Sequence, residues 1–331
     1  MINIYTTNNS TINKVEIATD NLIVPGDTIW MDLYDPTSAQ ERLIEKEFNI
    51  ALPTREEMGK IEVMSPFYQE GESYYMTITI LDQSNSEYLN SAALTFILTP
   101  RCLITLRHTD IPSWRSFTSF VARTIKSKNV CYTAELCLMM VVDLLVNHAA
   151  DVLEVAGNDL DILLQKVFSQ ADRKSSSDAS PANYYNDIIA RTGRTGNIIS
   201  KNRESLVSIN RMTIYFNQLE AITTKDQRTR LKYIAREIYS LGEYANFLSQ
   251  RNSFLLDATL GMISVEQNMI IKVFTVAAAA FMPPTLIASI YGMNFHFIPE
   301  LAWQFGYPLA LFLIVVSALV PYTFFKKKGW L

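Results

Sequence analysis

The feature that most constrains this chain is an uncharged apolar segment near its C-terminus. Between Val273 and Tyr291 the sequence contains no charged residue. A second apolar run, Pro308–Phe325, follows after a short loop and is closed by the lysines Lys326–Lys328. An apolar helix of about 20 residues is long enough to cross the roughly 30 Å hydrocarbon core of a bilayer. The sequence therefore predicts a C-terminal transmembrane hairpin of two helices.

The first apolar segment carries small and polar side chains at helical spacing. Steps of three and four residues place one set on a single helix face: Asp257, Gly261, Ser264, Asn268, Ile271, Thr275, Ala278, Met282, Thr285, Ser289 and Gly292. Small residues let transmembrane helices approach closely, so this stripe is compatible with ordinary helix–helix packing. The alternative is the lining of a narrow polar pore, repeated around a symmetry axis.

The residues at the end of this segment resemble a known signature. Tyr291-Gly292-Met293-Asn294-Phe295 is similar to the Tyr-Gly-Met-Asn-Phe motif of the CorA family of divalent-cation channels. Other family-like segments follow in the family's order: Val265–Asn268, Phe281–Thr285, Pro299–Leu301, Phe305–Pro308 and Phe325–Leu331. This set most resembles the proteobacterial magnesium and cobalt branch of the family. Nearer the N-terminus, Trp30–Leu33 followed by Pro36 also resembles a feature of the family.

Composition indicates a water-facing domain joined to a small membrane part. The 331 residues are 49% hydrophobic and 19% charged, and the net charge of −4 does not favour nucleic acid as a partner. The odd count and spacing of Cys102, Cys131 and Cys137 are not typical of a metal site and indicate reduced thiols in the cytosol. We interpret Cys131 and Cys137 as packing residues.

The predicted fold is an α+β cytosolic domain, with a mixed sheet and long helices, followed by a long stalk helix and the two-helix hairpin. The expected strands are Asn3–Tyr5, Thr28–Leu33, Tyr74–Leu81, Ala93–Leu98 and Cys102–Leu106. The expected helices are Ala39–Glu47, Trp114–Ser127, Ala134–Phe168, Tyr185–Phe216 and a stalk from about Gln227 to Tyr291, with Asp226 as candidate N-cap. The domain boundaries expected are 1–130 (α+β), 131–226 (long helices), 227–268 (stalk), 269–294 (first span), 295–307 (periplasmic loop), 308–325 (second span) and 326–331 (basic tail).

A heptad seam runs along the predicted stalk. Its members are Leu231, Ile234, Ile238, Leu241, Ala245, Leu248, Asn252, Leu255, Thr259 and Met262. A sustained repeat of this kind favours self-association, and a polar seam residue can fix the register of the partners. Packing against the helix Tyr185–Phe216 of the same chain explains the pattern equally well. Both can hold on different faces of the helix.

Charge predicts the orientation in the membrane. Lysines flanking a span favour the cytoplasmic side, so Lys326–Lys328 place the C-terminus there. Two spans then place the N-terminus on the same side, which agrees with a sequence start that has no signal-peptide pattern. We expect a multi-pass protein of the bacterial inner membrane with both termini in the cytoplasm.

The resemblance to the CorA family implies a homopentamer in which the first span lines the pore. The selectivity filter would comprise Tyr291, Gly292, Met293 and Asn294. The pore lining and the gate would comprise Asn268, Ile271, Phe274, Thr275, Ala278, Met282, Thr285 and Ser289. Asp257 would form a ring at the inner mouth. His296, where the family commonly has Glu, and Glu300 would lie in the entrance loop. The family's Mg²⁺-sensing carboxylates align best with Asp82 and Glu237.

The implied function is influx of Mg²⁺, with Co²⁺ and Ni²⁺ as further expected ions, through a pore that closes at high cytosolic Mg²⁺. Mg²⁺ is then substrate and regulatory ligand, and no cofactor is expected. The sequence lacks a Gly-rich phosphate loop and a supported nucleophile–base set, so an enzyme is not predicted. Two alternatives remain: a zinc transporter of the ZntB type, and a membrane-anchored coiled-coil sensor or scaffold without a pore.

Overall fold

The computed structural model describes residues 1–8, 11–17, 24–82, 90–109, 114, 133–169, 181–219, 222, 224–293 and 303–330. The chain divides into two compact units, Met1–Leu255 and Leu256–Leu331. Helix α7 (Lys225–Tyr291) begins in the first unit and ends in the second. At 1.5 Å per residue its 67 residues extend over about 100 Å.

A seven-stranded mixed sheet forms the base of the first unit. Its strands are β1 (Ile2–Asn8), β2 (Thr11–Ile17), β3 (Thr28–Tyr34), β4 (Phe67–Glu70), β5 (Ser73–Asp82), β6 (Asn90–Leu98) and β7 (Leu103–Arg107). Their order across the sheet is β2-β1-β3-β7-β6-β5-β4. Strands β3 and β7 pair in parallel, whereas the other neighbours pair antiparallel. This architecture confirms the predicted α+β class with a mixed sheet.

The two edge strands, β2 and β4, were not predicted from the sequence. Strand β2 is rich in polar residues, including Asn13, Lys14 and Glu16, and β4 has only four residues. Edge strands pair on one side only and need little apolar patterning, so they give a weak signal. The short helix α2 (Arg55–Met64) was missed as well. Of the predicted helix Trp114–Ser127, only Trp114 lies within the described residues.

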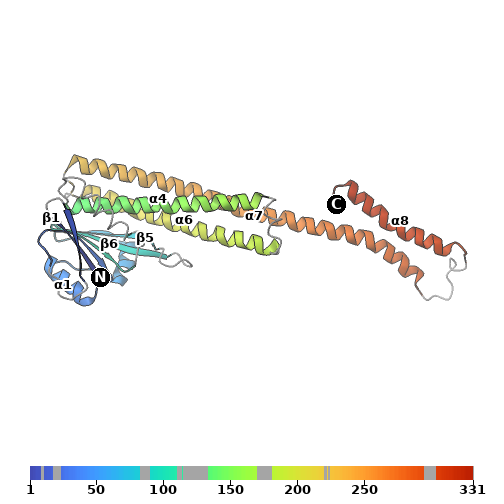
Figure 1. Ribbon diagram of the computed structural model, residues 1–331, viewed down its shortest axis with the longest axis horizontal. Coiled ribbons are helices and arrows are strands. Elements are labelled where there is room, and N and C mark those ends of the chain that lie inside the picture. Colours follow the sequence, from blue (N-terminus) through green and yellow to red (C-terminus); the bar gives the residue numbers. More distant parts are fainter. Residues whose placement is uncertain are drawn as a thin grey trace. The chain divides into compact units, whose positions relative to one another are not determined.

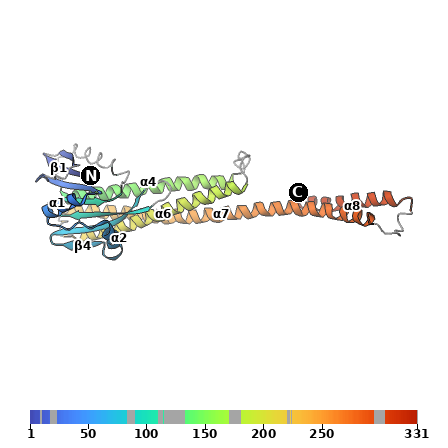
Figure 2. The same cartoon turned by 90° about the horizontal axis from the view of Figure 1, so that it is seen from below.

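Helices α1 (Ser38–Phe48) and α2 share an apolar core with one face of the sheet, whereas long helices run over the other face (Figures 1 and 2). Ile44 of α1 and Met58 of α2 are buried in this core together with Ile4, Met31 and Ile104 of the sheet. These strand residues alternate with side chains on the opposite face, as the two-residue period of a strand requires.

The long helices of the first unit are α4 (Ala134–Phe168), α6 (Pro181–Gln218) and the N-terminal part of α7 (Figure 1). Helix α4 begins and ends at the residues predicted from its periodicity. Ion pairs join α7 to α4 through Arg230 with Asp143 and Arg251 with Asp161. The Arg203 guanidinium of α6 donates to Asn246 Oδ1 of α7 at 3.0 Å. The three helices therefore form one layer of the unit.

The heptad seam of α7 is buried inside the first unit up to Leu255. Leu231, Ile234, Ile238, Ala245, Leu248 and Leu255 have at most 3% of their surface exposed. A Cβ added at Gly157 of α4 would lie 3.5 Å from Leu248, and one added at Gly196 of α6 would lie 2.6 Å from the Asn252 amide. The structure thus supports the reading in which the seam packs within its own chain. These six residues are not available to a second copy, whereas Leu241 and Asn252 of the seam are half-buried.

The N-cap of α7 differs from the prediction. Thr224 Oγ1 accepts from the backbone N–H of Gln227 at 3.3 Å, and Gln227 Oε1 accepts from the backbone N–H of Thr224 at 3.2 Å. This reciprocal pair is a capping box, with Thr224 as the N-cap residue. Asp226 lies in the first turn instead, where its negative charge favours the N-terminal end of the helix dipole. The prediction of Asp226 as N-cap was therefore wrong by two positions.

The second unit contains the C-terminal part of α7 and helix α8 (Gly306–Lys327). Helices α4, α7 and α8 are each long and apolar enough to cross a membrane, but their apolar windows are buried to very different extents, at 56%, 6% and 0%. The apolar side chains of α4 are thus already used in the core of the first unit. Those of α7 and α8 have little protein around them and match the hairpin predicted from the sequence.

Candidate functional site

The small and polar stripe of α7 lies opposite the face that the second unit covers. Val276 is buried, and Ala280, Pro283 and Ile287 are half-buried. The stripe residues from Asn268 to Gly292 are exposed: Asn268, Ile271, Thr275, Ala278, Met282, Thr285, Ser289 and Gly292. At 3.6 residues per turn the two sets lie about 200° apart around the helix axis. The stripe is therefore free to face something outside this unit.

Three hydroxyl groups of the stripe bond to their own helix. Thr275 Oγ1 donates to the carbonyl of Ile271 at 2.8 Å, and Thr285 Oγ1 donates to that of Phe281 at 2.7 Å. Ser264 Oγ donates in the same way to Leu260 at 3.1 Å. Because a hydroxyl has one proton and two lone pairs, this arrangement leaves the oxygens able to accept further hydrogen bonds. The stripe thus presents acceptors, which suits the water shell of a cation.

The C-terminal end of α7 leaves little room for a side chain at one position of the predicted filter. The backbone N–H of Gly292 donates to the carbonyl of Ala288 at 3.0 Å. A Cβ added at Gly292 would lie 3.1 Å from that same oxygen, so a larger residue would have to displace the backbone there. Met293 then donates to Ile290 at 3.3 Å and ends the regular structure. Asn294, His296 and Glu300 lie outside the described residues.

Large apolar side chains are also exposed on the stripe side of α7. Ile271, Phe274 and Met282 each expose at least 60% of their surface. All three belong, together with Ala278, to the pore lining and gate expected from the sequence. Exposure of this extent in a single chain is expected for side chains that face lipid or another subunit.

The acidic residues expected at the inner mouth and at the sensor come from helix α7 and strand β5. Asp257 and Glu237 are both exposed on α7, in the second and the first unit respectively. Asp82 is the last residue of β5 and pairs through its backbone with Asn90. Among the described residues, no group of three or more His, Cys, Asp or Glu side chains could hold a metal ion.

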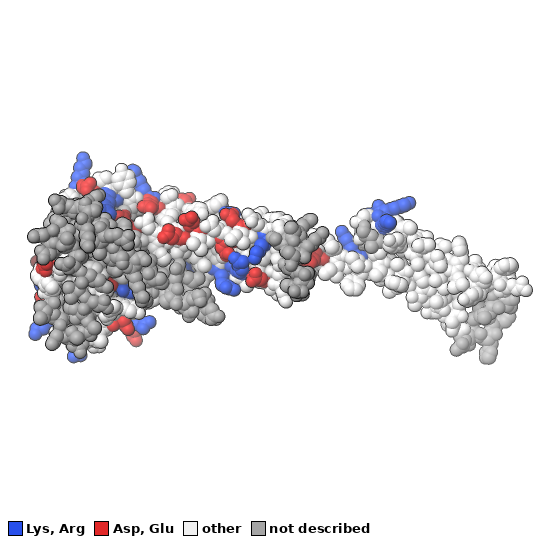
Figure 3. Space-filling view, in the orientation of Figure 1, with Lys and Arg blue, Asp and Glu red and all other residues white. Residues whose placement is uncertain are grey.

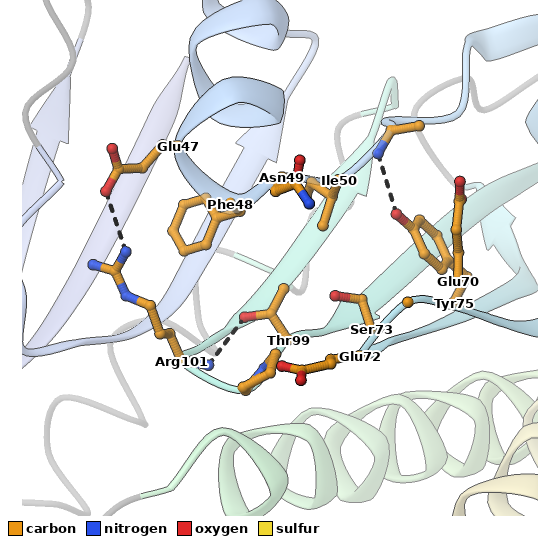
Figure 4. Close-up of a pocket in the computed structure, with 13 residues that line it drawn as sticks. Glu47, Phe48, Asn49, Ile50, Glu70, Glu72, Ser73, Tyr75, Thr99 and Arg101 are labelled. Atoms are coloured by element: carbon orange, nitrogen blue, oxygen red, sulfur yellow. Dashed lines mark hydrogen bonds and ion pairs between the residues drawn. The ribbon is translucent and has the colours of Figure 1, made fainter.

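One pocket lies in the first unit and is lined by none of the stripe residues. Its volume is about 800 Å³, and it lies between the end of α1, the β4–β5 turn and the β6–β7 turn (Figure 4). Arg101 Nη1 bonds to Glu47 Oε1 at 3.2 Å across one side, and the Tyr75 hydroxyl accepts from the backbone N–H of Ala51 at 3.3 Å. Burial raises the pKa of Tyr75, so its hydroxyl stays neutral.

The described cysteines behave as packing residues. Cys102 and Cys137 are free thiols and are buried in the first unit. Burial raises the pKa of the Cys102 thiol to about 11, which disfavours the thiolate that metal binding needs. Cys131 lies outside the described residues. The interpretation of Cys137 as a packing residue is confirmed.

Comparison with known protein families identifies the class. Residues 25–327 match the family described as "CorA-like Mg2+ transporter protein". The match covers most of the chain, from strand β3 through the long helices to the hairpin. It agrees with the resemblance carried by the motif at the end of α7. The chain therefore belongs to the CorA family. It is a membrane transporter of that family and not an enzyme, as the sequence predicted.

Individual relatives agree over the full length. The magnesium transport proteins CorA of Pasteurella multocida and Mannheimia succiniciproducens are 29% and 28% identical to this chain, and the alignments cover all of both proteins. The CorA protein of Escherichia coli K12 is 28% identical over the same extent. These relatives come from proteobacteria, as the motif set indicated.

Solved structures share the fold at low identity. The complete CorA magnesium transporter of Methanocaldococcus jannaschii superposes with a TM-score of 0.79 at 16% identity, covering 100% of this chain and 99% of that one. The ZntB cytoplasmic domain of Vibrio parahaemolyticus reaches 0.56 at 8% identity, over 78% of this chain and 96% of that one. The first superposition confirms the predicted order of an α+β domain, a long stalk helix and a C-terminal hairpin.

Proposed function

We propose that several copies of this chain form a channel for Mg²⁺ influx, with the polar stripe of α7 as its lining. The observation that carries the proposal is the position of the stripe, which is exposed and lies opposite the covered face of the same helix. The names of the full-length relatives support Mg²⁺ as the transported ion. The additional expectation of Co²⁺ and Ni²⁺ permeation rests on the resemblance to the magnesium and cobalt branch.

The pore must be shared between copies. Two membrane helices cannot enclose a path for an ion, so the first span has to be repeated around an axis. Five copies are expected from the family resemblance. In this arrangement α7 faces the axis and α8 faces lipid, and the exposed Phe274 and Met282 side chains meet their counterparts from neighbouring copies.

The ion's chemistry suits a ring of neutral oxygens at the outer end. Mg²⁺ dehydrates reluctantly and usually keeps several of its waters. A filter for the hydrated ion needs acceptors for the outward-pointing water hydrogens at a diameter that fits the water shell. Asn294 would supply one amide oxygen from each copy, and Gly292 a backbone carbonyl. Glu300 would attract cations to the entrance, where His296 adds no fixed negative charge when it is neutral.

A second ring of neutral oxygens is proposed at the cytoplasmic end of the pore. A ring of Asn268 amides would form a second site for the hydrated ion, and Asp257 carboxylates would line the mouth below it. Between the two sites, an apolar constriction would close the path by excluding water. It would be formed by Ile271, Phe274, Ala278 and Met282.

The driving force and the orientation follow from charge. With Lys326–Lys328 inside, the cytosol holds both termini, and the loop between the spans faces outward. A potential of 100 mV, negative inside, then favours entry of a divalent cation by about 4.6 kcal/mol. Influx therefore needs no nucleotide.

Covalent modification can test which face of α7 lines the path. Ala278→Cys lies on the stripe and Ala280→Cys lies on the covered face, so the two variants differ in position by only two residues. We expect a charged thiosulfonate reagent to reduce Mg²⁺ uptake into proteoliposomes to background for Ala278→Cys and to leave Ala280→Cys unchanged. The measurement is dye-monitored uptake before and after the reagent.

Wild-type protein is the control for the native cysteines. Equal block of both variants, or no block of Ala278→Cys, would contradict the proposed lining. Native mass spectrometry of the same preparations should show five copies, and a monomer that still conducts would rule out a shared pore. A protein that takes up Zn²⁺ but not Mg²⁺ would instead favour the zinc transporter. A protein that assembles stably but takes up neither ion would favour the scaffold.

Regulation by cytosolic Mg²⁺ is proposed to use a site between subunits, as the resemblance to the CorA family implies. We expect Asp82→Asn combined with Glu237→Gln to shift inhibition of uptake to higher internal Mg²⁺, since removal of two carboxylates weakens binding of the closing ion. Uptake is measured in proteoliposomes loaded with graded Mg²⁺. Unchanged inhibition would reject these residues as the sensor, whereas a wild-type channel that ignores internal Mg²⁺ would reject the regulation itself.

A further inference from the structure

All described charges in the last part of the second unit are lysines. From Gln267 to Trp330 the described residues contain Lys272, Lys326, Lys327 and Lys328 and no acidic side chain. The four lysines are exposed, and none has a carboxylate partner among the described residues. On the face seen in Figure 3, the blue side chains of the hairpin gather at one end of an otherwise uncharged surface.

Two separate elements supply these lysines, and the C-terminal tail joins them. The ammonium group of Lys272 on α7 lies 6.0 Å from the centre of the Trp330 ring, within the range of a cation–π contact. Trp330 also packs against Phe325 with ring centres 5.2 Å apart. The tail of α8 is therefore folded back toward α7, so that Lys272 and the terminal lysines belong to one surface.

The fold of this tail is built into the end of α8. Gly329 has φ of +69°, the left-handed conformation that favours glycine. The backbone N–H of Trp330 donates to the carbonyl of Phe325 at 3.1 Å, and that of Gly329 donates to Lys326 at 3.2 Å. This glycine-terminated helix end, with an apolar contact across it, is a recurrent C-cap. It fixes Trp330 and hence the surface that the four lysines share.

The chemistry of this surface fits an anion at the membrane boundary. Lysine binds phosphate as a point charge, and Trp is enriched where the hydrocarbon meets the headgroups. Basic clusters at the cytoplasmic end of membrane helices attract anionic phospholipids. The lysines lie at the ends of the two apolar segments. In a membrane this position is level with the lipid phosphates.

We infer that Lys272, the lysines of the α8 tail and Trp330 form a binding site for the headgroup of an anionic phospholipid at the cytoplasmic face. The headgroup phosphate sits between Lys272 and the tail, and the Trp330 ring holds the two lysine sources together. The site lies where the path-forming helix enters the membrane, so an occupied site ties α7 to α8 at that point. The inference rests on the proposed membrane orientation, but not on ion transport.

Native mass spectrometry of the full chain in detergent, titrated with phosphatidylglycerol, tests this site. Loss of one lysine near an anionic surface costs about 1 kcal/mol, so Lys272→Gln should weaken retention of the tightest lipid roughly fivefold. Trp330→Leu should weaken it as well, although it keeps all four lysines. Lys232→Gln, an equal charge change at an exposed position of α7 in the first unit, should leave retention unchanged.

Further arms separate the possible sources of the anion. Phosphatidylcholine should not be retained, and inorganic phosphate should not displace phosphatidylglycerol. If wild type, Lys272→Gln and Trp330→Leu retain phosphatidylglycerol equally, the inference is overturned, and the lipid is attracted only diffusely. Displacement of phosphatidylglycerol by inorganic phosphate would show that the lipid is not the occupant of the site. Asn294→Ala separates this site from transport, because it should retain the lipid while losing uptake.

Discussion

Replacing Asn294 by alanine should reduce Mg²⁺ uptake to the rate of protein-free liposomes while the protein still assembles. The alanine side chain has no oxygen, so each copy in the ring would lose its acceptor for the water shell of the ion. The preceding turn is held by a backbone hydrogen bond from Gly292 to the carbonyl of Ala288. Uptake by reconstituted protein and native mass of the same sample are the two measurements. Uptake at the wild-type rate would contradict the role of Asn294 in the filter.

A second substitution distinguishes the filter from a helix cap. Asn and Gly both favour the position that ends a helix, so Asn294 could act by stopping α7. Asn294→Gly keeps a good helix-ending residue and removes the amide oxygen. If the role is that of a ligand for the hydrated ion, Asn294→Gly should be as inactive as Asn294→Ala. Recovery of uptake in the glycine variant alone would show that helix termination is the function of Asn294.

Strong and local sequence signals predicted the membrane part and the long helices well. An uncharged apolar segment such as Val273–Tyr291 has few alternatives to a membrane helix. In α4, helical periodicity continues over all 35 residues and therefore defines where the helix begins and ends. The stripe on α7 was also visible in the sequence, because helical spacing alone decides which side chains share a face. Its position opposite the covered face needed the structure, since nothing in the spacing tells which side meets α8.

Signals that depend on distant residues were missed. The contact of Lys272 with Trp330 joins positions far apart in the sequence, and neither residue is unusual at a membrane boundary. The heptad seam was ambiguous for the same reason, because an apolar repeat does not say which helix fills it. The burial of its apolar residues, and the closeness of Leu248 to Gly157 and of Asn252 to Gly196, assign it to the chain's own helices.

The least expected feature of the first unit is a buried ion pair in the centre of its sheet. Asp32 of β3 is fully buried, and its carboxylate accepts from Arg107 Nε at 3.2 Å and from Arg107 Nη2 at 3.0 Å. Thr105 donates to the same carboxylate at 2.9 Å. The Arg107 guanidinium lies over the Tyr34 ring at 4.6 Å. Both charges are thus fully partnered at the one parallel pair among the described strands, β3–β7.

Arg107→Leu should therefore lower the free energy of unfolding of the first unit by about 3–5 kcal/mol, because it leaves the Asp32 carboxylate buried without its cation. Arg101→Leu is the matched control. Its partner is Glu47, and the two side chains are 48% and 46% exposed, so its loss should cost less than about 1 kcal/mol. Chemical unfolding of the full chain in detergent, followed by circular dichroism, measures both changes.

A second substitution in the Arg107→Leu background shows whether the uncompensated charge is the cause. Asp32→Asn removes the buried negative charge and keeps an acceptor for Thr105, so it should recover part of the lost stability when combined with Arg107→Leu. The same Asp32→Asn change in the wild-type background should be destabilising, because Arg107 then loses its anion. If the two substitutions simply add, the cost of Arg107→Leu comes from lost packing against Tyr34 rather than from the charge of Asp32.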